Sequence, residues 1–95
     1  DNDDPERTDP SRFDVAGPTA WMRWFAREGQ ALTRARGSEL QILATMYGPP
    51  GWMTTQRTLR GRDFDPAMDL ELGEYLAEFV RALRREDGLA VRWVS

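Results

Sequence analysis

The sequence of 95 residues contains no cysteine and no histidine, and all thirteen of its basic residues are arginines, so lysine is absent too. These absences exclude a thiol nucleophile, a Ser-His-Asp triad, a zinc site of histidine or cysteine, a Schiff-base lysine and a Gly-Lys-Ser/Thr phosphate loop. Without cysteines, the sequence says nothing about redox compartment. The chemistry left to the chain is that of carboxylates, hydroxyls, arginines and aromatic rings.

Strong charge and long apolar runs are also missing. The net charge is -3, which gives no reason to expect a nucleic-acid partner. No run is long enough to predict a membrane span, and the acidic start does not resemble a signal peptide. The chain is 40% hydrophobic and has four tryptophans, which predicts one small packed unit over residues 1–95.

Helical spacing of apolar residues predicts a first helix over residues 19–36, which Gly37 ends. Trp21 and Trp24 lie on its apolar stripe, and we interpret them as packing residues. Glu28 interrupts this stripe. Residues 1–18, polar and proline-rich, are predicted to be loop.

A second helix is predicted to begin at Asp65-Pro66, a capping residue followed by a first-turn proline, and to end at Gly88. Asp63 and Asp65 are better explained by turn and cap formation than by acid-base work. Because of this capping, neither aspartate is a candidate catalytic group.

Two short, largely apolar runs, 40–46 and 89–94, predict buried strands. The order helix, strand, helix, strand favours an α/β fold with parallel strands, such as part of a (β/α)8 barrel. Between them, residues 47–65 form a long irregular loop after the first strand. Ligands of such folds bind at the carboxyl ends of the strands, so this loop is the predicted functional segment.

Two prolines with flanking glycines present Trp52 on a rigid turn that also contains Tyr47. An indole face can stack on a pyranose ring, and polar neighbours can bind its hydroxyls or pair with a sugar carboxylate. These neighbours are Thr54, Thr55, Gln56, Arg57, Arg60 and Arg62. The alternative, that Trp52 and Met53 only pack at the top of a core while the arginines are solvated, stays open.

Ile-Leu-Ala-Thr at 42–45 followed by Pro-Pro-Gly-Trp-Met at 49–53 resembles the strand-and-loop signature of family-thirty glycoside hydrolases, which include glucosylceramidases, xylanases and β-1,6-glucanases. Tyr-Leu and Phe-Val of the second helix and Val-Arg-Trp-Val-Ser at 91–95 recur there in the same order. The family commonly has tryptophan, serine and lysine where Tyr47, Gly48 and Thr54 stand. The resemblance therefore does not specify the substrate.

The resemblance implies an internal fragment of a (β/α)8 barrel, from the end of its second strand to its fourth. The parent would be a retaining glycosidase with two carboxyl groups about 5 Å apart, one of them a glutamate soon after Ser95. This chain would then have no catalytic residue, no metal, no cofactor and no hydrolytic activity. It would contribute Trp52 and an aspartate among Asp1, Asp3 and Asp4 to sugar binding, in a protein that the resemblance suggests is extracellular.

Two other interpretations remain. The chain can be a complete small carbohydrate- or protein-binding module whose aromatic loop is the recognition surface, or part of another clan of barrel hydrolases. A complete module should unfold cooperatively, whereas a slice with unpaired strands should be loosely folded or aggregate. The sequence does not predict an oligomeric state.

Overall fold

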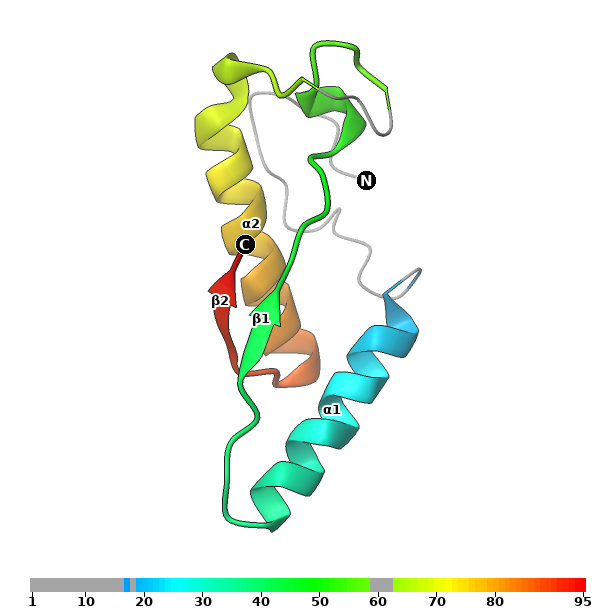
Figure 1. Cartoon of the computed structure of the whole chain (residues 1–95), viewed down its shortest axis with the longest axis vertical. Coiled ribbons are helices and arrows are strands. Elements are labelled where there is room, and N and C mark those ends of the chain that lie inside the picture. Colours follow the sequence, from blue (N-terminus) through cyan, green and yellow to red (C-terminus); the bar gives the residue numbers. More distant parts are fainter. Residues whose placement is uncertain (1–16, 18, 59–62) are drawn as a thin grey trace.

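A computed structural model describes residue 17, residues 19–58 and residues 63–95 (Figure 1). Its elements follow one another as α1 (Ala20–Ala35), β1 (Ile42–Ala44), η2 (Gly51–Met53), η3 (Pro66–Met68), α2 (Asp69–Asp87) and β2 (Val91–Val94). The η elements are single turns of 3-10 helix. The predicted helix, strand, helix, strand order is confirmed.

Strands β1 and β2 pair in parallel, as predicted, and form a two-stranded sheet. Ile42 lies opposite Val91 and Leu43 opposite Trp93, with an irregularity in the register between Ile42 and Leu43. The connection between them runs through α2, which covers one face of the sheet (Figure 1). The molecule is thus a mixed helical structure with a small parallel sheet.

Helix α2 ends at the predicted glycine, but it begins at Asp69, one 3-10 turn after the predicted start at Asp65-Pro66. The carboxylate of Asp65 accepts a hydrogen bond from the backbone N–H of Ala67 at 3.0 Å, and Pro66 opens the 3-10 turn that leads into α2. Gly88 ends the helix in the left-handed conformation, with φ of 62°. The N–H of Leu89 donates to the carbonyl of Leu83 at 3.3 Å, so the chain reverses into β2 with Leu89 over the helix.

The core is small and lies between α2 and the sheet. Its buried members are Leu83 of α2, Leu89 of the connecting turn and Val91 of β2. Ala26, Ile42, Ala44, Phe79 and Val80 pack around these three. The alternation along β1 follows from this packing: Ile42 and Ala44 face the helix, whereas Leu43 is 56% exposed on the other face.

Helix α1 docks through polar side chains at the end of α2. Asp87, whose side chain is inaccessible to solvent, accepts hydrogen bonds from Arg23, one of them at 2.9 Å, and from Nη1 of Arg27. The amide of the buried Gln30 donates to the carbonyl of Gly88 at 2.9 Å and accepts from the N–H of Ala90 at 3.0 Å. These contacts form the clamp between α1 and the α2–β2 turn.

The apolar stripe of α1 does not face the core. Trp21 is 81% exposed and Phe25 is 74% exposed, and Leu32 is exposed as well. Trp21 and Trp24 contact each other edge to face, with ring centroids 6.2 Å apart. The interpretation of these two tryptophans as core-packing residues was therefore wrong: the clamp places the opposite, polar face of α1 against α2.

Neither α1 nor α2, nor any other helix among the described residues, combines the length and apolar character that crossing a membrane needs.

Candidate functional site

The carboxyl ends of the two strands lie side by side and continue the parallel pairing beyond the sheet. The N–H of Ser95 donates to the carbonyl of Ala44 at 3.0 Å, and the N–H of Met46 donates to the carbonyl of Ser95 at 2.9 Å. The hydroxyls of Thr45 and Ser95 are 3.1 Å apart. This edge is where the sequence places the functional loop.

Local hydrogen bonds and one buried side chain fix the turn that carries Trp52. The N–H of Met53 donates to the carbonyl of Pro50 at 2.9 Å, and the Thr54 hydroxyl donates to the carbonyl of Gly51 at 2.8 Å. Met53 is fully buried and Thr54 is 1% exposed. Because both residues after Trp52 are anchored, its half-buried indole is held on a short turn of defined shape.

The returning part of the loop pairs with this turn. Thr54 and Phe64 form an antiparallel bridge, and the N–H of Asp65 donates to the carbonyl of Met53 at 2.9 Å. Between them Arg57 adopts a positive φ of 50°, a conformation that is uncommon for a residue with a side chain. The loop is therefore tied to the start of α2 rather than extended into solvent.

Two predicted ligand-binding residues hold this loop together. The Gln56 side chain donates to the carboxylate of Asp63 at 2.6 Å and accepts from its N–H at 3.2 Å. The backbone N–H of Thr55 donates to the Asp63 carbonyl at 2.9 Å. Thr55 and Gln56 are exposed and are not among the residues that line the hollow described next.

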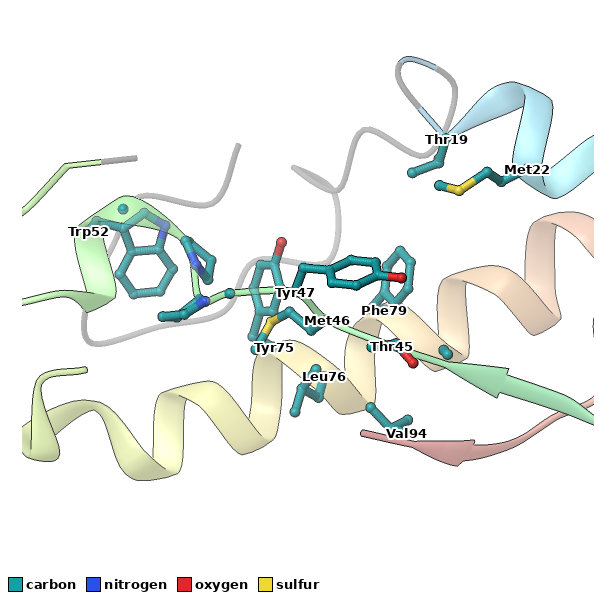
Figure 2. A pocket seen from close by; sticks show the side chains of 15 residues that line it. Thr19, Met22, Thr45, Met46, Tyr47, Trp52, Tyr75, Leu76, Phe79 and Val94 are labelled. Atoms are coloured by element: carbon teal, nitrogen blue, oxygen red, sulfur yellow. The ribbon is translucent and has the colours of Figure 1, made fainter. Parts of the chain in front are cut away.

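An open hollow of about 500 Å³ lies between this loop, the carboxyl ends of the strands and both helices (Figure 2). Its walls are mostly apolar and aromatic. They consist of Thr19, Met22, Ala44, Thr45, Met46, Tyr47, Gly48, Pro49, Pro50, Gly51, Trp52, Tyr75, Leu76, Phe79 and Val94. The hollow thus brings together Tyr47 and Trp52, the two predicted aromatic site residues.

Helix α2 supplies a wall of the hollow that sequence reasoning did not identify. Tyr75 and Phe79 lie on the same helical stripe as the core residue Leu83, and such a stripe has the same pattern whether its residues pack in a core or line a hollow. Burial raises the pKa of the Tyr75 hydroxyl above its ordinary value. Like an ordinary tyrosine hydroxyl, this group is neutral at physiological pH.

No charged residue is among the described residues that line the hollow. Its polar side-chain groups are the hydroxyls of threonine and tyrosine, which can each donate and accept a hydrogen bond, and the indole N–H of Trp52, which can only donate. The described part of the chain also contains no group of three or more acidic residues that could hold a metal ion. The arrangement can bind a neutral molecule that has both an apolar face and hydroxyl groups.

Asp1, Asp3 and Asp4, the predicted acidic contacts to a sugar, lie outside the described residues, as do Arg60 and Arg62. Asp65 caps η3, and Asp63 binds the Gln56 side chain, which confirms their predicted turn and cap roles.

Comparisons of this chain with models of protein families, with curated proteins and with solved structures found no match.

Proposed function

We propose that this chain forms one wall of the sugar-binding cleft of a retaining β/α-barrel glycoside hydrolase, without its catalytic carboxylates. The observation that carries the proposal is the aromatic hollow at the carboxyl ends of two parallel strands, which contains Tyr47 and Trp52. Ligands of parallel α/β folds bind at this end of the strands. Aromatic rings beside neutral hydroxyls suit a pyranose, which has C–H faces and hydroxyl edges.

The exposed strand residues support the barrel part of this proposal over a complete small module. Leu43 and Trp93 lie opposite each other in the register, and both are about half exposed on the face that α2 does not cover. Parallel sheets are ordinarily buried on both faces. In a barrel, this face would be the packed interior, and further parallel strands would pair with the outer edges of β1 and β2.

Titration with neutral glycosides, monitored by saturation-transfer NMR, tests the sugar-binding proposal. We expect weak, saturable binding by the chain, and Trp52→Ala should weaken it about tenfold because stacking is lost. Trp21→Ala is the matched control, since Trp21 is 81% exposed and does not line the hollow. Binding that is absent, or equally strong in Trp52→Ala, would refute the proposal.

The assignment to a retaining enzyme has its own test. The proposed parent protein carries a glutamate within a few residues after Ser95 and a second on a later strand, and the chain alone should hydrolyse no glycoside. Sequencing the gene downstream of Ser95 is the direct measurement. If it shows neither glutamate, the assignment to this reaction is wrong, while sugar binding would still be decided by the titration.

A further inference from the structure

Helix α2 provides one wall of the hollow, with the aromatic rings of Tyr75 and Phe79. Tyr75 and Phe79 are four residues apart and so lie one above the other on the same face of the helix. In Figure 2 the ring of Tyr75 rises from α2 beside Met46, with its hydroxyl directed away from the helix toward the open side. Tyr47 and Trp52 belong to the segment after β1 and line the same hollow.

The Tyr75 ring is half-buried on a regular helix and carries a polar hydroxyl group. Leu76 and Phe79 of the same helix also line the hollow, so the ring lies among residues on a regular helix rather than on a loop. Its hydroxyl offers one donor and two acceptor positions, so it can bind a ligand hydroxyl in addition to a protein partner. A tyrosine hydroxyl is protonated at neutral pH, and burial moves the pKa of Tyr75 further in that direction.

We propose that Tyr75 is a ligand-binding residue, and that a neutral sugar ring binds between α2 and the loop after β1. This inference rests on the proposed sugar-binding function. It adds one ligand-binding residue, Tyr75, and a preference for neutral over carboxylated sugars. The Tyr75 hydroxyl hydrogen-bonds a ligand hydroxyl, and the rings of Tyr47 and Trp52 contact the apolar face of the sugar. A carboxylated sugar binds less well, because its charge would enter a space whose described lining contains no cation.

Two measurements test the inference. In the first, methyl β-glucoside and methyl β-galactoside are each compared with the matching methyl uronide by saturation-transfer NMR on the unaltered chain. The members of each pair differ only in a neutral hydroxymethyl group or a carboxylate. We expect the uronides to bind at least about tenfold more weakly, as for an uncompensated charge.

The second measurement removes only the hydroxyl. Tyr75→Phe keeps the ring, and the loss of one hydrogen bond should weaken binding of the neutral glycosides by about three- to tenfold. Glu74→Gln is the matched control, because Glu74 is an exposed neighbour on α2 that does not line the hollow. Circular dichroism on both variants separates a lost contact from a lost fold.

The outcomes distinguish the inference from the function beneath it. Uronides that bind as well as the neutral glycosides overturn the selectivity, and unchanged binding by a folded Tyr75→Phe overturns the role of Tyr75; sugar binding itself survives either result. If Tyr75→Phe does not fold, the comparison of glycosides with uronides on the unaltered chain still decides the selectivity. If no glycoside binds the unaltered chain, the proposed function and this inference are both wrong.

Discussion

Asp87 joins two helices that are far apart in the sequence. It ends α2, its side chain is inaccessible to solvent, and it accepts hydrogen bonds from Arg23 and Arg27 of α1. Hydrogen bonding from Arg23, with a smaller contribution from Arg27, holds the pKa of this carboxyl below its ordinary value against the opposing effect of burial. The charged form of Asp87 therefore stabilises the docking of α1.

Asp87→Asn should lower the free energy of unfolding by about 2 kcal/mol, because it removes charge-assisted hydrogen bonds and leaves two arginines without their partner. Urea denaturation at neutral pH measures this loss. Glu39→Gln is the control: it breaks the exposed Arg34–Glu39 pair, which should change stability by less than about 1 kcal/mol. Equal effects of the two substitutions would show that the clamp does not hold α1.

The lowered pKa also gives a pH dependence. A carboxyl whose pKa is lower in the folded than in the unfolded state stabilises the fold above the unfolded pKa, near 3.9. That contribution is lost as the pH falls from about 4 through the folded pKa. Unfolding curves between pH 7 and pH 3 should therefore converge for the native chain and Asp87→Asn, and a constant difference would contradict the assignment.

At the residue level, the sequence predicted Trp52 and Tyr47 as site residues because both belong to an unusual Pro-Pro-Gly turn after a strand. It did not predict Tyr75, since an aromatic residue on a helical stripe has the same pattern whether it packs in a core or lines a hollow. It also placed Thr55 and Gln56 among ligand-binding candidates by residue type. Their hydrogen bonds with Asp63, eight and seven residues away, depend on how the loop folds back.

Among the elements, the boundaries were largely predictable and the orientation of α1 was not. Helix ends follow from local residues, as the positive φ angles of Gly37 and Gly88 illustrate. The orientation of α1 depends on contacts between Gln30 and the Gly88–Ala90 turn and between Arg23 and Asp87, which join positions about sixty residues apart. The amphipathic spacing predicted that the apolar face of α1 would pack against the core, because this pattern takes account of apolar burial alone.

Gly88 and Gly73 offer a paired test of the α2 description. Gly88→Ala should destabilise the chain by about 1 kcal/mol, because a left-handed φ of 62° is unfavourable for a residue with a side chain. Gly73→Ala lies inside α2 with nothing within 4 Å of an added methyl group, so it should stabilise by about 0.5–1 kcal/mol. Thermal denaturation of both variants measures the signs, and two changes in the same direction would contradict the helix boundary.

Across the whole described structure, several large apolar side chains lie at the surface. Trp21, Phe25 and Leu32 form the uncovered stripe of α1, and Leu43 and Trp93 form the uncovered face of the sheet. The buried core contains only a few residues beneath α2. Apolar surfaces of this kind ordinarily mark contacts with other protein, which agrees with the proposal that the chain is one part of a larger barrel.

The chain on its own should therefore self-associate. We expect its mass in light scattering to rise with concentration, and the double substitution Trp21→Ser with Phe25→Ser to reduce that rise without lowering stability, since both side chains are exposed. Leu70→Ser is the control, because Leu70 is 86% exposed but lies at the start of α2, away from the stripe. A monomer at all concentrations would mean that the exposed stripe needs no partner.

Chemical-shift mapping is a direct test of sugar binding in the hollow between the Trp52 turn and α2. Methyl β-glucoside and methyl β-galactoside would be titrated into 15N-labelled chain while the indole N–H of Trp52 and the backbone amides are followed. We expect saturable shifts at Trp52, Tyr47 and Tyr75, with Leu43 and Trp93 unchanged. Shifts confined to the Leu43 and Trp93 face, or no shifts with either glycoside, would contradict it.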